Sequence, residues 1–187
     1  MKFIDYNSPE KAIINDTFKS IPYMDMWISS IIEGYIYEKV DKVNNKGYRE
    51  EYTERYGKKE GECKEWWYNG QLWRQCYYKE GKEEGEYKWW NSDGQLERQC
   101  YYKEGKKDGE YKQWYKNGQL ERQCYYKEGK YEGEYKQWYH NGQLRRQMYY
   151  KDGKREGENK SLDKEGNLTE HKIYTGDEVI KDLLNPN

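Results

Sequence analysis

Four consecutive 24-residue blocks with nearly the same sequence fill the middle of the chain, from Gly61 to Glu156. They read GECKEWWYNGQLWRQCYYKEGKEE, GEYKWWNSDGQLERQCYYKEGKKD, GEYKQWYKNGQLERQCYYKEGKYE and GEYKQWYHNGQLRRQMYYKDGKRE. So regular a repeat predicts an elongated stack in which each unit contacts only its neighbours, because one short unit cannot bury an apolar face alone. Function therefore has to be sought on surfaces that recur along the stack.

The composition limits what such a stack can bury. The chain has 187 residues, of which 34% are apolar, with 23 tyrosines and 8 tryptophans but only 2 phenylalanines. Tyrosine and tryptophan must supply most of the buried surface. We therefore expect a thin aromatic core that is partly wet at its phenolic edges.

Each block contains two candidate strands, for example residues 110–115 and 120–127, separated by an Asn-Gly or Asp-Gly pair. Such a pair favours a two-residue type I′ turn, in which both residues have positive φ. A second short link follows each hairpin at the Glu-Gly or Asp-Gly of Gly81, Gly105, Gly129 and Gly153. Because both links are short, consecutive strands are predicted to pair antiparallel in a continuous meander.

This turn geometry predicts a register. Across the Asn117-Gly118 turn the expected pairs are Tyr115 with Leu120, Gln113 with Arg122, and Tyr111 with Cys124. One face then carries these side chains and Tyr126, and the other carries Glu110, Lys112, Trp114, Glu121, Gln123, Tyr125 and Lys127.

Between hairpins, the same rule pairs Glu97 with Lys112 and Glu121 with Lys136. It also sets Arg74, Arg98 and Arg122 against Tyr87, Tyr111 and Tyr135, where a guanidinium can lie on a ring. A bulge at a recurring glycine such as Gly109 would shift these pairs locally.

Degenerate copies on both sides extend the predicted array to residues 37–175, as expected for end repeats that must not be extended further. Residues 1–36 are predicted to form a helical cap, because Met24, Ile28 and Ile31 fall on one helical face. Residues 176–187 are predicted to form a second cap or tail, a short helix that begins at Asp177 and buries Val179, Ile180, Leu183 and Leu184. The predicted fold is thus an all-β repeat, an elongated antiparallel meander of stacked β-hairpins with short helical caps at both ends.

The balance of 34 basic and 35 acidic side chains gives no bulk attraction to nucleic acid or to an anionic bilayer. No apolar run approaches the roughly 20 residues that span a membrane, and the first residues lack the order of a secretory signal. We expect a soluble, intracellular protein of the cytoplasm, with incorporation into a virion as a further location.

The cysteines are interpreted as small packing residues. Cys76, Cys100 and Cys124 recur at the repeat period, so they would lie two strands apart, roughly 9 to 10 Å, too far for a disulfide. Cys63 and Cys76 would face each other across the first hairpin, as a dithiol or a strained disulfide. In a reducing compartment they are expected to stay thiols.

The block GEYKQWYKNGQLERQCYYKEGKYE resembles the bacterial and viral variant of the MORN repeat, and the resemblance covers about Tyr52 to Tyr174. Its G-E-Y/W, N-G and Y-x-x-G elements recur in register four times. The resemblance implies a twisted, elongated sheet of stacked hairpins that serves as a scaffold for protein contacts or, in some members, for membrane lipids. It implies no catalytic residues.

The candidate protein-binding residues are an aromatic ladder with one tryptophan and one tyrosine per block: Trp66, Trp90, Trp114, Trp138, Tyr77, Tyr101, Tyr125 and Tyr149. Exposed rings at regular intervals can clasp an extended partner or a helix. The alternative is that they only stack on one another and stiffen the sheet. Stacked rings beside lysines also suit single-stranded nucleic acid, but acidic residues opposite those lysines disfavour it.

Catalysis and metal binding are not expected. Enzyme sites need unlike groups that converge in a concave site, whereas the acids and bases here repeat along a sheet. His140 and His171 are far apart in the sequence, and His140 occupies a turn position. We predict no enzyme activity, no metal and no cofactor.

The sequence favours a non-enzymatic repeat scaffold that mediates protein–protein interaction. The alternative is a structural subunit of a large assembly such as a virus particle. Membrane-lipid surface binding is a third and weaker hypothesis.

Overall fold

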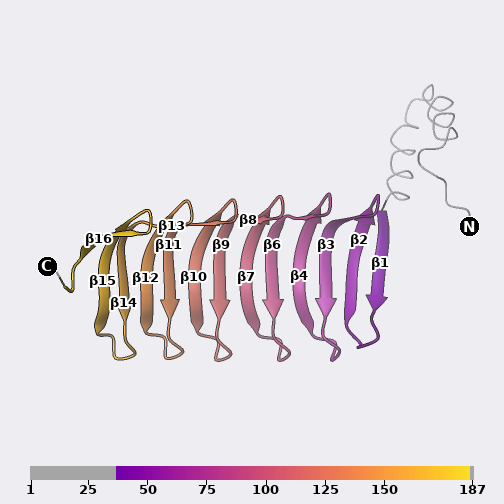
Figure 1. The fold of residues 1–187 in the computed structure, drawn as a ribbon. Coiled ribbons are helices and arrows are strands. Elements are labelled where there is room, and N and C mark those ends of the chain that lie inside the picture. Colours follow the sequence, from indigo (N-terminus) through magenta and orange to yellow (C-terminus); the bar gives the residue numbers. More distant parts are fainter. Residues whose placement is uncertain (1–36, 186–187) are drawn as a thin grey trace, which may run out of the picture.

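The computed structural model describes residues 37–185, which form one open antiparallel sheet (Figure 1). Its strands are β1 (Tyr37–Val43), β2 (Arg49–Arg55), β3 (Lys58–Trp66), β4 (Leu72–Lys79), β5 (Lys82–Glu83), β6 (Gly85–Trp90), β7 (Leu96–Lys103), β8 (Lys106–Lys107), β9 (Gly109–Trp114), β10 (Leu120–Lys127), β11 (Lys130–Trp138), β12 (Leu144–Lys151), β13 (Lys154–Arg155), β14 (Gly157–Leu162), β15 (Leu168–Thr175) and β16 (Glu178–Asp182). They lie side by side in chain order, with β5, β8 and β13 attached to β4, β7 and β12. The predicted meander of stacked hairpins is confirmed, and it includes the degenerate copies.

The prediction of a helix at the C-terminal end is wrong. Residues 178–182 form β16, which pairs antiparallel with β15. Val179 and Ile180 are 50% and 63% exposed instead of buried. The open edge of β15 presents backbone groups that a new strand can pair, whereas a helix of so few residues is marginal by itself.

The predicted N-terminal helical cap falls on residues 1–36, outside the described residues. Within residues 37–185, no helix has the length and apolarity needed to cross a bilayer.

The Asn-Gly turns differ from the predicted two-residue type. Tyr115 N–H donates to Gln119 O at 2.9 Å, and Gly118 N–H donates to Tyr115 O at 2.9 Å. Of the turn residues only Gly118 has positive φ, +80°, so the loop is a type I turn closed by a glycine bulge. Asn117 Oδ1 accepts the Gln119 N–H at 3.1 Å. The asparagine is therefore held by its side chain, and the glycine alone takes the left-handed conformation.

The type I′ geometry occurs instead at the Glu-Gly turns. Glu128 and Gly129 have φ of +50° and +83° between the paired Lys127 and Lys130. Glu80, Glu104 and Asp152 repeat this left-handed conformation. Such a conformation is costly for glutamate, and hydrogen bonds from the preceding repeat hold it. Glu128 N–H donates to Asp108 Oδ2 at 3.1 Å, and Gly129 N–H donates to Lys107 O at 2.8 Å.

Within each hairpin the interior register is as predicted. Tyr111 pairs with Cys124, and Gln113 pairs with Arg122. Near the turn the prediction is wrong, because Leu120 pairs with Trp114 and a bulge follows. The bulge lets Glu121 accept a hydrogen bond from Gln113 Nε2 at 2.9 Å, so Glu121 lies on the opposite face from the predicted one.

Between hairpins the register is shifted by two residues from the prediction. Lys112 pairs with Gln99 and Lys136 with Gln123, so the predicted Glu97–Lys112 and Glu121–Lys136 pairs do not form. The predicted bulge at the repeat glycines accounts for the shift, and Gly109 has φ of +126°. An even shift leaves the two faces unchanged.

Two of the three predicted arginine–tyrosine contacts are present. The guanidinium carbon of Arg74 lies 5.8 Å from the Tyr87 ring centroid, and that of Arg122 lies 6.0 Å from the Tyr135 ring. Arg98 lies over Trp89 at 5.3 Å and not over Tyr111. In the second repeat Trp89 takes the place of the glutamine found in the third and fourth, and its ring contacts the guanidinium of Arg98.

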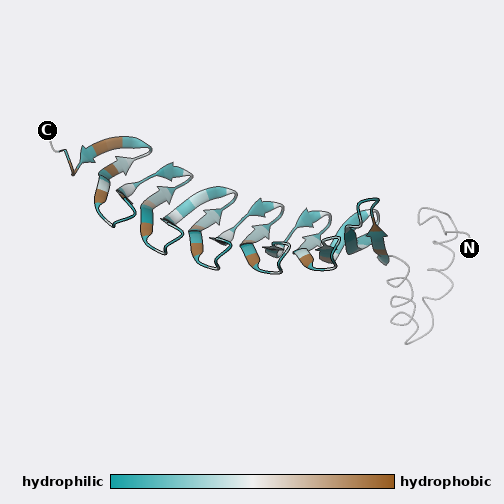
Figure 2. Ribbon diagram, turned by 90° about the horizontal axis from the view of Figure 1, so that it is seen from below, coloured by the Kyte–Doolittle hydropathy of each residue, from teal (hydrophilic) through white to brown (hydrophobic). Residues whose placement is uncertain are grey.

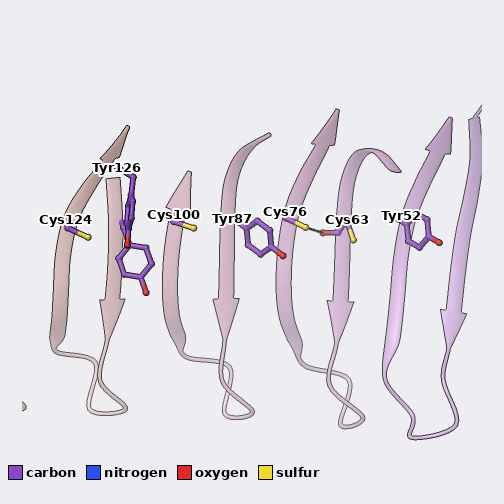
Figure 3. Packing of buried hydrophobic residues seen from close by; sticks show 8 residues of the cluster. Tyr52, Cys63, Cys76, Tyr87, Cys100, Cys124 and Tyr126 are labelled. Atoms are coloured by element: carbon purple, nitrogen blue, oxygen red, sulfur yellow. Dashed lines mark hydrogen bonds between the residues drawn. The ribbon is translucent and has the colours of Figure 1, made fainter. Parts of the chain in front are cut away.

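The core is a narrow seam on one face, which we call the inner face and define by Tyr111 and Cys124. Seven of its buried members lie at one level across successive strands, and Tyr126 lies two residues further along β10 (Figure 3): Tyr52, Cys63, Cys76, Tyr87, Cys100, Tyr111, Cys124 and Tyr126. Hairpins place a ring opposite a small sulfur side chain, as in Tyr87 with Cys100, and a glycine opposite a second ring, as in Gly109 with Tyr126. Large and small side chains thus alternate, and this fills a one-layer core.

The different burial of the two faces predicts that removal of a tyrosine ring lowers the free energy of unfolding more on the inner face than on the opposite one. Tyr111→Ala should lower the free energy of unfolding by about 3 kcal/mol, because the side chain is 4% exposed and its loss leaves a cavity. Tyr125→Ala, on the opposite face and 49% exposed, should cost much less. Urea denaturation of both variants tests this expectation, and equal destabilisation would contradict the assignment of the faces.

The left-handed glutamate predicts a stabilising substitution. Glu128→Asn should raise the free energy of unfolding by up to about 1 kcal/mol, because asparagine tolerates positive φ at this turn position. Lys130→Asn, two residues later in β11, is the control and should be neutral or destabilising. Thermal melts followed by circular dichroism give the comparison, and a lower midpoint for Glu128→Asn than for the wild type would refute it.

Candidate interaction surface

The predicted aromatic ladder lies on the face opposite the core seam, which we call the outer face and define by Lys112, Gln123 and Tyr125. Its tyrosines are Tyr77, Tyr101, Tyr125 and Tyr149, which are 44%, 37%, 49% and 52% exposed. They occupy equivalent positions on β4, β7, β10 and β12. Equivalent strands are two strand spacings apart, so successive rings recur at roughly 9 to 10 Å.

The tryptophan row is less accessible than the tyrosine row. Trp66, Trp90, Trp114 and Trp138 are all half-buried. Each is paired across its hairpin with a leucine: Leu72, Leu96, Leu120 and Leu144. The result is a stripe of alternating tryptophan and leucine near the Asn-Gly turns. Recurring apolar positions are visible from below in Figure 2.

Among residues 37–185 no ring contact joins two members of the tryptophan row. The leucine strands separate them. Among these residues the tryptophans pack against leucines and not directly on one another.

A polar lattice lies between the two aromatic rows. Glu110 accepts hydrogen bonds from Lys112 Nζ at 2.7 Å and from Gln123 Nε2 at 2.6 Å. Glu134 repeats the pattern with Lys136 and Gln147, both at 2.8 Å. In the earlier repeats the tyrosine joins the lattice, and Tyr101 OH donates to Glu86 Oε1 at 3.3 Å. Each exposed ring thus stands beside a fixed carboxylate, amide and ammonium group.

These contacts shift the titration of the glutamates. The Lys112 hydrogen bond, with that of Gln123, holds the pKa of Glu110 below its usual value near 4.5. The pKa of Glu134 is lowered in the same way by Lys136. At the end of the array His171 replaces the glutamine, and its hydrogen bond is the main cause of the lowered pKa of Glu158. The lattice is therefore charged and balanced at neutral pH.

Further hydrogen bonds tie each turn to the next repeat on the Asn-Gly side. Tyr115 OH donates to Trp138 O at 2.8 Å, and Tyr139 OH donates to Leu162 O at 2.9 Å. Asn117 Nδ2 donates to His140 O at 2.9 Å. They keep the outer-face rows aligned between repeats.

The two histidines do not come together. His140 lies exposed in a turn, and His171 Nε2 lies 2.6 Å from Glu158 Oε1. A different group, Glu50, Cys63 and Glu65, places its potential ligand atoms within 4.8 Å of one another. Its carboxylates already form ion pairs with Lys59 and Arg74, so the cluster is charge-balanced by the protein's own cations.

Sequence reasoning identified the exposed tyrosines but missed the lattice around them. The sequence contained a signal for this lattice, since the glutamate, lysine and glutamine equivalent to Glu110, Lys112 and Gln123 stand at the same positions in every block. The predicted pairs of glutamate with lysine came from a register that the glycine bulges shift. The acidic side chains that hold the Glu-Gly turns, such as Asp108, were also missed, since their partners lie one repeat away.

Comparison with known families divides the chain at the Glu-Gly and Asp-Gly turns described above. A family profile described as a MORN repeat variant matches residues 59–80, 83–104, 107–128 and 131–152. Each match ends at the glutamate or aspartate of a type I′ turn. A comparison with curated protein sequences gives no significant match.

Two solved structures illustrate the likeness among known folds. A mutant of S. aureus TarM, in complex with Fondaparinux, alpha-GlcNAc-glycerol and UDP, is 12% identical with a TM-score of 0.32, covering 78% of this chain and 26% of that one. A second TarM structure is 12% identical with a TM-score of 0.30, covering 76% and 26%. The chain thus spans about a quarter of these proteins, and likeness at this level carries no functional argument.

The lattice predicts a specific acid response. A lowered pKa in the folded state means that Glu110 stabilises the fold above its unfolded pKa, near 4.5, and that this contribution is lost as the pH falls further. Glu110→Gln should therefore be less stable than the wild type at pH 7, with the difference closing in acid. Lys112→Gln should flatten the same acid limb. Urea midpoints between pH 3 and pH 7 test this, and wild-type acid limbs in both variants would contradict it.

Proposed function

Since the chain belongs to the MORN-repeat family, we propose that it is a non-enzymatic scaffold that binds another protein along the outer face. The observation that carries this proposal is the row of four tyrosines, 37% to 52% exposed, at equivalent positions of successive repeats. Tyrosine offers a large contact area at low entropic cost and keeps a polar hydroxyl at its edge.

The lattice favours specific recognition over adhesion. Each ring has a carboxylate, an amide and an ammonium group beside it, already ordered by mutual hydrogen bonds such as Gln123 to Glu110. Groups that are ordered before binding lose little conformational freedom when the partner docks.

The spacing suggests a partner with its own regular period. An α-helix rises about 1.5 Å per residue, so roughly 9 to 10 Å corresponds to six or seven residues. A helix laid across the strands would present one side chain to each tyrosine in turn. A long amphipathic helix is therefore the partner that this surface suits best.

The charge pattern speaks against two other partners. Outer-face lysines such as Lys112 and Lys136 are ion-paired with Glu110 and Glu134. A membrane-lipid or nucleic-acid surface would need unpaired basic groups to attract phosphates. Protein binding needs no such excess.

A second candidate function, a structural subunit of a larger assembly, is favoured by the edge strand β16. It pairs only with β15 among the described strands, and its Val179 and Ile180 are exposed. Open edges with apolar side chains support strand-to-strand association. Native mass measurement distinguishes the two: a monomer with a dissociable ligand supports the scaffold, and stable oligomers that Ile180→Lys disrupts support the subunit.

The row of exposed tyrosines on the outer face predicts which variant loses the partner. The double variant Tyr101→Ala, Tyr125→Ala should retain the sheet by circular dichroism and lose at least tenfold in partner capture from the source, because two adjacent contacts are removed. Tyr68→Ala, at an exposed ring in a turn (70% exposed), is the matched control and should capture normally. Quantitative mass spectrometry of the captured proteins gives the result. Undiminished capture by the folded double variant would reject this surface.

A further inference from the structure

The first strict hairpin differs from the others at the centre of the core seam. Cys63 of β3 and Cys76 of β4 are directly opposite each other, 1% and 0% exposed. The equivalent pairs in the next three hairpins are Tyr87 with Cys100, Tyr111 with Cys124, and Tyr135 with Met148. Within residues 37–185 this is the one hairpin in which two thiols face each other.

The backbone geometry at this position suits a covalent bond. Residues directly opposite in an antiparallel pair have Cα atoms roughly 4.5 to 5.5 Å apart. This lies inside the range of roughly 4.4 to 6.8 Å that disulfides span. Both cysteines are free thiols, and Cys76 Sγ lies 3.9 Å from the carbonyl oxygen of Cys63 (Figure 3). Formation of the bond would require rotation of both side chains toward each other.

The surroundings give the two thiols different chemistry. Lys59 Nζ lies 3.9 Å from Cys63 Sγ. A hydrogen bond from Cys76 is the main cause that lowers the pKa of Cys63 to about 7; the charges of Lys59 and Arg74 act in the same direction, and the carboxylate of Glu50 opposes them. The same hydrogen bond and burial raise the pKa of Cys76. Thiolate is the reactive form of cysteine.

The other two cysteines lack this arrangement. Burial raises the pKa of Cys100 to about 11 and that of Cys124 to about 12. Each faces a tyrosine, so each would have no second thiol to react with across its hairpin. They are internal controls for the first pair.

We propose that Cys63 and Cys76 form a peroxide-sensitive dithiol, a modification site in which a small hydroperoxide joins β3 to β4. The Cys63 thiolate attacks one oxygen of hydrogen peroxide, the O–O bond breaks, and a sulfenic acid and hydroxide form. The Cys76 sulfur then attacks the sulfenic sulfur, the S–O bond breaks, and the Cys76 proton leaves with that oxygen as water. Hydroxide takes up the proton that Cys63 had released. Two thiols lose two electrons, and the peroxide becomes two waters.

The burial of the pair selects the size of the oxidant. At 1% and 0% exposure the sulfurs are closed to a bulky disulfide such as oxidised glutathione but open to a molecule near the size of water during local opening of the sheet. The site is independent of the tyrosine row, since it lies on the inner face.

Mass spectrometry of the full chain, before and after digestion, tests the proposal. The folded protein is treated with hydrogen peroxide, alkylated in denaturant and digested. The alkylatable thiols should fall from four to two, with a peptide linking Cys63 to Cys76. Cys100→Ala should keep this link. Cys76→Ser, which keeps a hydrogen-bond donor beside Cys63, should stop at a sulfenic acid that dimedone traps on Cys63.

The wild-type result alone decides the proposal if a variant does not fold. Four alkylatable thiols after treatment, or a link between any other pair, would overturn it. Oxidised glutathione should form the bond at least tenfold more slowly than peroxide, and an equal rate would overturn the part that concerns the size of the oxidant.

Discussion

A single layer of sheet has no second layer to cover it, so each repeat can be stabilised only by the repeats on either side. The protein meets this constraint at both ends of its strands. At one rim the Gly129 N–H donates to Lys107 O of the preceding repeat, and at the other the Tyr115 hydroxyl donates to Trp138 O of the next. Each repeat is therefore positioned twice against its neighbour, and like side chains lie in straight rows.

The same constraint separates the two faces. The inner face has room for one seam, in which rings such as Tyr111 alternate with cysteines, and a glycine opposite Tyr126 leaves space for the ring. The outer face is left with groups that stabilise one another through hydrogen bonds and ion pairs. The outer face therefore repeats one arrangement of an exposed tyrosine beside a carboxylate, an amide and an ammonium group. The dithiol arises where the first repeat carries Cys63 in place of the tyrosine found in the next three.

The alternation of side chains along each strand predicted the strand pairing inside each hairpin, but it did not predict the conformation at the turns. The pairing of Tyr111 with Cys124 follows from alternation and a short turn, and it is correct. The type I′ turn predicted at the Asn-Gly pairs is wrong, because only the glycine there takes positive φ. That conformation occurs at Glu128, where the acceptor on Asp108 stabilises it. The C-terminal segment was predicted as a helix from its apolar spacing, and it became a strand because β15 has an open edge to pair with.

The sequence by itself determined the order of the strands, the antiparallel meander, the thin aromatic core and, away from Leu120 and Glu121 at the turns, the residues that share a face. These properties depend on a 24-residue period and on alternation along a strand, which are local. Only the tertiary structure decided the turn conformations, the two-residue shift at the glycines, the half-burial of Trp114 beside Leu120 and the environment of Cys63. These depend on hydrogen bonds, packing and charges contributed by neighbouring strands and repeats, and no single block contains that information.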